Sequence, residues 1–321
     1  MTNAKRISVL GCGRWGSFIA WYLDHIGHRV TLYGRPGSGT LAQLRQTRQN
    51  DYLTLPETIT LTDDIACVHA AEIVVISIPT QQLQSLCNQL IDLRGKPVVL
   101  CMKGIEIETG RRLSQIVGDS LDASNSVSVW IGPGHVQEFL RGVPNCMVID
   151  SADEAAKRML VEEFSSELIR FYYGADLIGN EIGAAAKNVI GIAAGMLDGA
   201  GIGTLKGALM SRGTREIARL IVAMGGKELS AYGLCHLGDY EATLFSPHSQ
   251  NRRYGECFIT GQAYSKLAEG YYTVRALKLL SERHQVELPI CWAVYDILYE
   301  HADPRATMEA LFHRSLKEEF A

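Results

Sequence analysis

The sequence has no excess of basic charge. Its 31 Lys and Arg residues are outnumbered by 35 Asp and Glu residues, so the formal net charge is −4. A chain without a positive field lacks the broad attraction that draws nucleic acid, and no basic amphipathic segment indicates a membrane surface. We therefore predict no nucleic-acid partner and no stable membrane insertion.

Paired cysteines and a secretion signal are also missing. The eight cysteines include no C-x-x-C pair, and the opening segment MTNAKRISVLGCG has no A-x-A cleavage pattern. In a chain of 321 residues, such cysteines are typical of reduced thiols in a cytoplasmic protein. We predict a cytoplasmic location and no metal site.

The sequence has no uninterrupted apolar run long enough for a clear membrane span. The best candidate, Ile182–Met196, contains Lys187 and is bounded by Glu181 and Asp198. Because a charge inside a span is costly, this pattern favours a buried helix of a globular domain.

Short apolar runs alternate with helical patterns up to about residue 150. Strands are predicted at Ile7–Leu10, Arg29–Tyr33, Glu72–Ile78, Pro97–Met102, Val127–Ile131 and Asn145–Ile149. Helices are predicted between them at Trp15–His25, Leu41–Gln49, Gln81–Ile91 and Glu108–Val117. Continuous apolar strands that alternate with helices are typical of βαβ units in a doubly wound α/β fold.

The alternation of apolar strands with helices ends after Tyr173. Residues 153–173 indicate one helix and a closing strand, and from Asn180 onward the pattern is helical with no clear strand. We predict a Rossmann-like α/β domain over residues 1–178 and an all-α domain over residues 179–321. No linker rich in Pro, Gly or Ser separates them, so we expect a large shared interface.

A glycine-rich segment joins the first predicted strand to the first helix. It has the sequence ISVLGCGRWG, with Gly11, Gly13 and Gly16 in the spacing G-x-G-x-x-G. In this context the glycines permit a tight turn, close approach of a pyrophosphate and close packing of helix on strand. The segment predicts a dinucleotide site, the alternative being a glycine-rich turn without a ligand.

The end of the second strand bears on the choice of cofactor. It has the sequence VTLYGRPG, which offers Arg35 where an NAD-selective site usually has an acidic residue. We therefore favour NADP(H), with NAD(H) still possible and Arg35 as a solvated loop residue the alternative. Arg45 and Arg48 are near in sequence, but nothing fixes their positions.

Two segments follow predicted strands at the sheet edge where α/β folds bind ligands. Lys103 follows the strand VVLCM, and the strand VSVWI ends in Gly132, Pro133 and Gly134. We expect the lysine and the backbone of this turn to face a ligand.

Lys187 lies in the helical segment NEIGAAAKNVIGIAAGMLDG. Residues at helical spacing from it include Ala184, Gly191, Ala194 and Gly195. Small neighbours leave room for another backbone or a ligand beside the ammonium group. A lysine in such a setting needs a partner or a chemical role, and a purely structural ion pair is the alternative.

A run of hydrogen-bonding side chains follows in the segment GLCHLGDYEATLFSPHSQNRRYGE. It includes Asp239, Ser249, Gln250, Asn251, Arg252 and Arg253. These groups fit a segment that receives a phosphate or carboxylate, although a solvated loop uses similar residues.

Taken in order, these segments resemble the NAD(P)-dependent sn-glycerol-3-phosphate dehydrogenases of the bacterial, soluble kind. The resemblance includes the Gly11–Gly16 loop with Trp15, M-K-G at 102–104 and G-P-G-H-V-Q-E at 132–138. It continues through AAAKNVIGIAAGMLDGAGIG, SRGTREIARL, LGDY and SPHSQNRRYG. It therefore spans nearly the whole chain.

The resemblance implies roles for individual residues. The implied cofactor contacts are Gly11, Gly13, Arg14, Trp15, Gly16, Arg35, Lys103, Val136, Gln250 and Glu269. The implied substrate contacts are Lys103, Gly132, Gly134, Lys187, Asp239, Ser249, Asn251 and Arg252. Lys187 corresponds to the family's catalytic proton donor and acceptor, with Lys103 and Asp239 beside it as further catalytic residues.

Three positions depart from the family pattern. Gly134 replaces a Ser or Thr, Val136 replaces an Ala, and Gln250 replaces the first arginine of an S-R-N-R-R block. Loss of an arginine that meets a phosphate removes on the order of 1.5–3 kcal/mol, unless Arg252 or Arg253 compensates.

The implied reaction is the reversible reduction of dihydroxyacetone phosphate to sn-glycerol 3-phosphate, which supplies phospholipid synthesis. Lys187 would act as general acid, with its pKa lowered by burial and Lys103 and raised by Asp239. Two alternatives stay open: a dehydrogenase of another small phosphorylated or hydroxy-acid substrate, and a protein that binds NADP(H) without turnover. A homodimer is compatible with a dehydrogenase of two domains.

Overall fold

A computed structural model describes residues 4–315 and 318–319 of the chain. The last residues of the predicted second domain, 316–317 and 320–321, lie outside the described residues.

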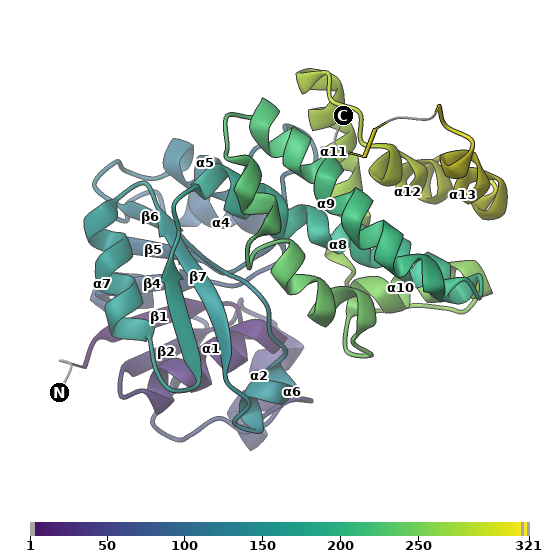
Figure 1. Ribbon diagram of the computed structural model, residues 1–321. Helices are drawn as coiled ribbons and strands as arrows, with labels where there is room; N and C mark the ends of the chain where they lie inside the picture. Colours follow the sequence, from purple (N-terminus) through teal and green to yellow (C-terminus); the bar gives the residue numbers. More distant parts are fainter. Residues whose placement is uncertain (1–3, 316–317, 320–321) are drawn as a thin grey trace.

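One sheet forms the centre of the first half of the molecule (Figure 1). Within the described chain it has eight strands in the order β3-β2-β1-β4-β5-β6-β7-β8. Their bounds are β1 (Arg6–Leu10), β2 (Arg29–Tyr33), β3 (Thr60–Thr62), β4 (Ile73–Ile76), β5 (Pro97–Leu100), β6 (Ser126–Ile131), β7 (Asn145–Ser151) and β8 (Ile169–Tyr173). The order β3-β2-β1-β4-β5-β6 is that of the doubly wound Rossmann fold, and it confirms the predicted fold class.

The pairing is parallel from β3 to β6, with Ile7 of β1 opposite Ile73 of β4. At the other end, β7 runs antiparallel to β6, with Ser151 opposite Ser128, and β8 runs parallel to β7. The parallel sheet expected from the apolar runs thus ends at β6.

Helices cover both faces of this sheet. Their bounds are α1 (Arg14–His25), α2 (Gly39–Thr47), α3 (Cys67–Ala70), η1 (Thr80–Gln82), α4 (Leu83–Gln89), α5 (Leu113–Ser120), α6 (Val136–Leu140) and α7 (Glu154–Phe164). On one face, α1 and α7 bury Phe18 and Phe164 in a core that includes Trp130. On the other face, α4 and α5 bury Leu83 and Ile116. Burial on both faces explains the continuous apolar strands.

Some local predictions were wrong. The helix predicted at Glu108–Val117 begins only at Leu113, because residues before it form a turn in which Gly110 has φ +71°. The short strand β3 was not predicted, since its sequence, Thr-Leu-Thr, has little apolar character. The short helices α3 and α6 were missed as well.

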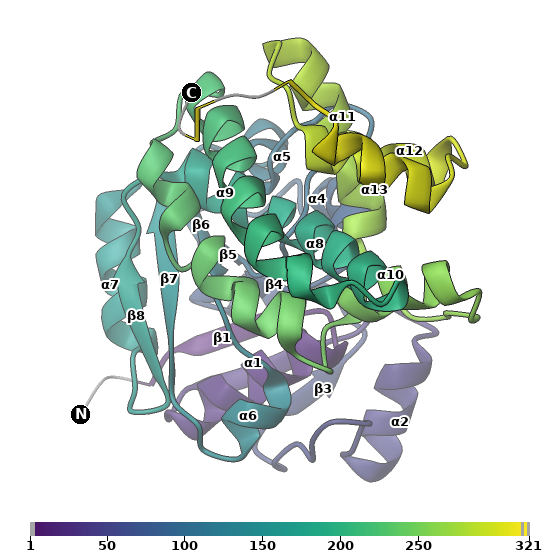
Figure 2. The ribbon, with the colours of Figure 1, turned by 45° about the vertical axis from the view of Figure 1, so that its right-hand side comes forward.

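The second half is helical, with no strand after β8 in the described residues. It contains α8 (Leu177–Gly199), η2 (Gly203–Leu205), α9 (Lys206–Ala223), η3 (Glu228–Tyr232), η4 (Leu237–Asp239), η5 (Glu241–Phe245), α10 (Gln250–Thr260), α11 (Glu269–His284), α12 (Pro289–Tyr299) and α13 (Pro304–Phe312). Helix α8 is central and packs against α9, α10, α11 and α12 (Figure 2).

Small residues bring α8 and α10 into backbone contact. A Cβ atom at Gly195 would lie 1.8 Å from the carbonyl oxygen of Arg252. From the other side, a Cβ atom at Gly255 would lie 2.1 Å from the carbonyl oxygen of Ile192. The face of small residues predicted beside Lys187 is therefore occupied by a neighbouring backbone.

Helix α8 also contacts the sheet, where it packs against β6 and β7. Its residue Ala184 belongs to the core under one sheet face, whereas Val189 and Ile190 belong to the helical core. No helix in the described ranges is long and apolar enough to cross a membrane.

Candidate active site

The glycine loop between β1 and α1 has the geometry of a phosphate cradle. Gly11 has φ +112°, and a Cβ atom there would lie 2.1 Å from the carbonyl oxygen of Ser77. A Cβ atom at Gly16 would lie 1.8 Å from the carbonyl oxygen of Gly11. A Cβ atom at Gly13 would meet no protein atom within 4 Å, and Gly13 gives α1 no side-chain cap. The start of α1 thus has no side-chain cap and open space beside Gly13, which suits a phosphate.

Arg14 and Trp15 join this loop to the rest of the domain. Arg14 Nη2 donates to Gln137 Oε1 at 2.6 Å, and its guanidinium lies 5.1 Å from the ring centre of Tyr52. The Trp15 ring packs at 6.3 Å from Phe139. Val136, another predicted cofactor contact, is buried in the same core.

Arg35 lies just after β2 and is exposed. No hydrogen bond or ion pair of its side chain is found among the residues that the structure describes. By contrast, Arg45 pairs with Asp63 at 2.6 Å, and Arg48 donates to the carbonyl oxygen of Ile59 at 2.7 Å. Of these three arginines, Arg35 is therefore the one available to a ligand.

Three predicted catalytic residues meet in one cluster. Lys103 follows β5, Lys187 lies in α8 and Asp239 lies in η4. Asp239 Oδ2 lies 2.7 Å from Lys103 Nζ and 2.9 Å from Lys187 Nζ. Lys103 Nζ also donates to the carbonyl oxygen of Gly132 at 2.5 Å, so the cluster joins both halves of the molecule.

The cluster is buried and carries net positive charge. Asp239 is 1% exposed and Lys187 is 7% exposed. Two ammonium groups share one carboxylate, which leaves one uncompensated positive charge. Burial, opposed by Asp239 and assisted by Lys103, lowers the pKa of Lys187 to about 8. A lysine with such a pKa can act as acid or base near neutral pH.

Three residues that the sequence analysis did not select hold or adjoin this cluster. Lys187 Nζ donates to Thr243 Oγ1 at 2.6 Å, and Asn188 Nδ2 donates to the carbonyl oxygen of Lys103 at 2.9 Å. The third, His135, lies near Lys187 and Asp239. Asn188 is adjacent to Lys187 in sequence and His135 is adjacent to Gly134, so both could have been noticed, whereas Thr243 reaches Lys187 only through the fold.

Most of the predicted contacts at the start of α10 have hydrogen-bond or ion-pair partners in the described part of the chain. Ser249 caps α10 by accepting from the N–H of Arg252. Gln250 Oε1 accepts from Tyr264 at 2.7 Å. Arg252 Nε pairs with Asp198 Oδ2 at 2.7 Å, and Arg253 is exposed. Asp198 also pairs with Lys206 at 2.7 Å, and Arg252 has a second carboxylate partner, Glu256, at 3.4 Å, so its guanidinium is already engaged by acidic residues.

Asn251 and Glu269 connect α10 and α11 to the site. Asn251 Nδ2 donates to Asn188 Oδ1 at 3.0 Å, and Gly270 N donates to Asn251 Oδ1 at 2.9 Å. Glu269 Oε1 accepts from Thr80 N at 3.4 Å, and burial raises the pKa of Glu269 to about 7. Glu269 therefore faces the sheet domain from the helical half.

Gly134 lies where a side chain has little room. It has φ +144°, and a Cβ atom there would lie 2.4 Å from Phe139 Cε2. Because the Phe139 ring fills this space, a serine or threonine would displace it. Gly132, with φ +137°, likewise leaves its backbone close to Lys103.

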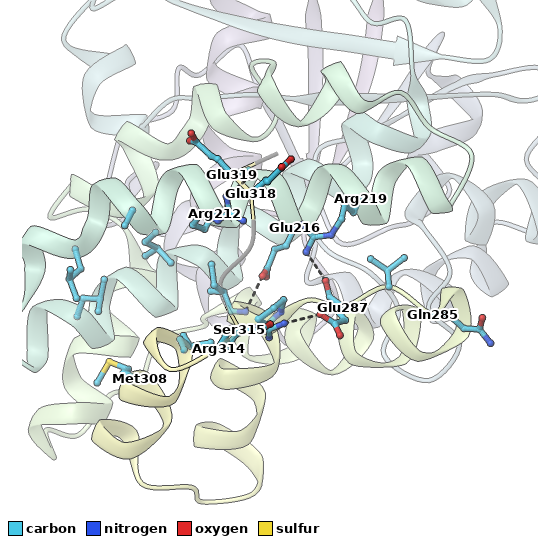
Figure 3. A pocket seen from close by; sticks show the side chains of 18 residues that line it. Arg212, Glu216, Arg219, Gln285, Glu287, Met308, Arg314, Ser315, Glu318 and Glu319 are labelled. Carbon is cyan, nitrogen blue, oxygen red and sulfur yellow. Dashed lines mark hydrogen bonds and ion pairs between the residues drawn. The ribbon is translucent and has the colours of Figure 1, made fainter. Parts of the chain in front are cut away.

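A separate cavity of about 670 Å³ lies in the helical half (Figure 3). It is lined by Arg212, Glu216 and Arg219 of α9, by Ile290 of α12 and by Met308 of α13. Neither lysine of the cluster lines it. Among the described residues, no group of three or more His, Cys, Asp or Glu side chains is placed to bind a metal ion.

The strand order, the glycine loop and the buried lysine pair define the class of Rossmann-type dehydrogenases. A family model described as "NAD-dependent glycerol-3-phosphate dehydrogenase N-terminus" matches residues 6–157, and the corresponding C-terminus model matches residues 176–309. The chain belongs to the NAD-dependent glycerol-3-phosphate dehydrogenase family.

Individual relatives cover nearly the whole chain. The glycerol-3-phosphate dehydrogenase (NAD(P)+) of Moorella thermoacetica is 39% identical, over 97% of this chain and 96% of its own length. That of Thermoanaerobacter sp. (strain X514) is 36% identical over 98% of both chains. The crystal structure of the Coxiella burnetii glycerol-3-phosphate dehydrogenase matches with a TM-score of 0.91 and 27% identity, over 97% of this chain and 99% of that one. The predicted resemblance is confirmed.

Proposed function

We propose that the protein catalyses the reversible reduction of dihydroxyacetone phosphate to sn-glycerol 3-phosphate with a nicotinamide dinucleotide. The observation that carries the proposal is the buried Lys187–Asp239–Lys103 cluster in a chain of this family. The product would supply phospholipid synthesis.

The glycine loop fits a dinucleotide. Open space at Gly13 and the uncapped start of α1 suit a pyrophosphate. When bound, the nicotinamide supplies the hydride for reduction or accepts it in oxidation. The residues proposed to hold the cofactor are those of the loop, Arg35, Lys103, Val136, Gln250 and Glu269.

Lys187 acts as the general acid in the proposed reduction. Its ammonium group gives a proton to the oxygen that becomes the C2 hydroxyl, and in the oxidation its neutral amine takes that proton back. A pKa near 8 keeps both forms accessible around neutral pH. Thr243 and Asp239 orient the side chain by accepting its other N–H groups.

Lys103 and Asp239 set the electrostatics of the step. Asp239 holds the two ammonium groups close together, so that positive charge is already in place where the carbonyl oxygen becomes anionic. The uncompensated positive charge also favours an anionic substrate. Gln250 adds no charge, so substrate binding relies on the lysines and on neutral donors such as Asn251.

The activity is tested by following NADPH oxidation at 340 nm with dihydroxyacetone phosphate, beside NADH at matched concentrations. Turnover that yields sn-glycerol 3-phosphate would support the proposal. Intact NADPH binding without turnover would instead favour a different small phosphorylated or hydroxy-acid substrate.

The preference for NADP(H) rests on Arg35, whose exposed guanidinium is available to a 2′-phosphate. We expect Arg35→Gln to raise the KM for NADPH about tenfold, as for a lost charge-assisted hydrogen bond, with little change for NADH. Arg45→Gln is the matched control, because Arg45 is paired with Asp63. Equal effects of Arg35→Gln on both cofactors would contradict the preference.

We also propose a cytoplasmic homodimer. All eight cysteines are free thiols, which fits a reducing compartment. Light scattering coupled to size-exclusion chromatography would test the dimer, and cell fractionation would test the location.

A further inference from the structure

His236 and Tyr240 lie on either side of Asp239 in the sequence and are hydrogen-bonded to each other. His236 immediately precedes η4, Tyr240 immediately follows it, and each residue is 0% exposed. Their ring centres lie 4.9 Å apart, and the Tyr240 hydroxyl oxygen lies 2.7 Å from His236 Nε2. A side-chain bond therefore closes the short segment that carries the carboxylate of the lysine cluster.

The other ring nitrogen of His236 connects η4 to α8. Its Nδ1 atom lies 2.8 Å from the carbonyl oxygen of Gly183. Because a carbonyl oxygen can only accept, Nδ1 carries the hydrogen and donates it to Gly183. Burial lowers the pKa of His236 to about 4, so the ring is neutral and Nε2 accepts from the Tyr240 hydroxyl. Both ring nitrogens are thus used in bonds that hold η4 in place.

Gly183 lies one helical turn before Lys187 in α8. In an α-helix its carbonyl oxygen accepts the backbone N–H of residue 187, so the same oxygen meets both the imidazole and the main chain of the lysine. A Cβ atom at Gly183 would lie 3.0 Å from His236 Cβ, so the glycine permits this close approach. The N–H of Asp239 donates to the carbonyl oxygen of His236 at 3.0 Å. His236 therefore connects the backbone of Lys187 with the backbone of Asp239.

The position of the Asp239 carboxylate affects the charge state of the proton donor. Asp239 of η4 and Lys103 after β5 are the charged groups that act on Lys187, at 2.9 Å in the case of Asp239. Asp239 raises the pKa of Lys187, whereas burial and Lys103 lower it. A carboxylate farther from Lys187 would stabilise the ammonium form less, so the proton would be lost at a lower pH. The neutral ring of His236 adds no charge to this balance.

We propose that His236 is a positioning residue of the reaction, whose imidazole holds Asp239 against Lys187 by bridging Gly183 and Tyr240. This assignment rests on the proposed function and adds to it a residue that does not touch the substrate. Its role is to keep the carboxylate where it stabilises the ammonium form of Lys187.

The test is the pH dependence of kcat/KM for the reduction of dihydroxyacetone phosphate. His236→Phe keeps a buried ring but removes both hydrogen bonds. We expect it to lower kcat about tenfold and to move the fall in kcat/KM toward lower pH by about 0.5 to 1 pH unit. His236→Asn should recover much of both, because its side-chain amide replaces Nδ1 as the donor to Gly183. A role in stability alone would leave the pH of this transition unchanged.

Tyr240→Phe is a milder variant, because it removes only the bond to Nε2. It should move the transition in the same direction by a smaller amount. Tyr22→Phe is its matched control, since Tyr22 is equally buried and its hydroxyl is hydrogen-bonded at 2.8 Å to Ser166 in the sheet domain. This control should leave the transition where it is.

NADPH binding, followed by fluorescence, reports whether each variant is folded. If His236→Phe does not fold, the comparison of Tyr240→Phe with Tyr22→Phe decides the question. An unchanged transition in the folded variants, no recovery in His236→Asn, or equal shifts in the two tyrosine variants would overturn the assignment and leave the proposed function intact. Failure of the unaltered protein to reduce dihydroxyacetone phosphate would overturn both.

Discussion

At the scale of single residues, Lys187 is the most informative position. Most of its neighbours in α8 are small or apolar, and it shares a single carboxylate, that of Asp239, with Lys103. Sequence spacing identifies the unusual setting of this lysine, but not its partners. Asp239 lies far along the chain, and only the fold brings its carboxylate to within 2.9 Å of Lys187 Nζ.

The pKa of Lys187 leads to a prediction about pH. Reduction needs the ammonium form, so its kcat/KM should fall as pH rises through about 8, whereas oxidation needs the amine and should rise through the same range. Rates measured in both directions from pH 7 to 10 check this. Parallel profiles, or a transition only near the ordinary lysine pKa, would contradict it.

At the scale of secondary-structure elements, the contact between α8 and α10 positions the site. Helix α10 carries Asn251, which is hydrogen-bonded to Asn188 of α8. The contact depends on glycines in both helices, and repeated small residues in the sequence indicated this close approach. The identity of the approaching helix could not be predicted, because composition does not say which surfaces meet.

Substitution of a glycine at this contact should lower the stability of the folded protein. Gly195→Ala would place its Cβ atom 1.8 Å from the carbonyl oxygen of Arg252, so α10 must move. We expect a loss of about 3 kcal/mol in the free energy of unfolding. Gly207→Ala in α9 is the control, since nothing lies within 4 Å, and it should stabilise the protein by about 1 kcal/mol. Urea unfolding of both variants measures the difference, and equal effects would refute the close contact.

Glu216 shows how a buried carboxylate holds the start of a helix. It accepts from the N–H groups of Ile290 and Cys291 at the beginning of α12, beside the cavity in Figure 3. Burial nonetheless raises its pKa to about 6. Between pH 4.5 and 6 the folded protein therefore holds a proton that the unfolded chain has released, and stability from this group falls as pH rises.

Glu216→Gln removes this titration. As pH rises from 4.5 to 7, the free energy of unfolding of the unaltered protein should fall by about 2 kcal/mol relative to that of the variant. Urea unfolding of both proteins at the two pH values gives this difference directly. A difference that does not change with pH would show that Glu216 titrates normally.

At the scale of the whole molecule, much of the architecture could be predicted from periodicity. The strands β4 and β5 are continuous apolar runs in the middle of the sheet, and β1, β2, β6 and β7 are mostly buried although they include polar residues such as Ser8, Thr31 and Ser128. The polar edge strand β3 and the antiparallel direction of β7 could not be predicted, since neither leaves an apolar pattern. The site shows the same division: the glycine loop and Lys187 are visible in the sequence, whereas the contact of Thr243 with Lys187 depends on tertiary packing.

In this account, the proposed catalytic residues lie at the interface between the two halves of the molecule. The sheet domain provides the glycine loop and Lys103, and the helical half provides Lys187 and Asp239. The proposed proton donor, Lys187, and the proposed cofactor cradle thus come from different halves, so the proposed reaction requires both.

The most direct test of this account is to measure the turnover of the Lys187→Met variant with NADPH and dihydroxyacetone phosphate, together with its affinity for NADPH. Methionine keeps most of the packing volume and removes the proton donor. We predict a loss in kcat of about 10²- to 10⁴-fold with unchanged NADPH affinity. Near-normal turnover would contradict the account and remove Lys187 from the chemistry.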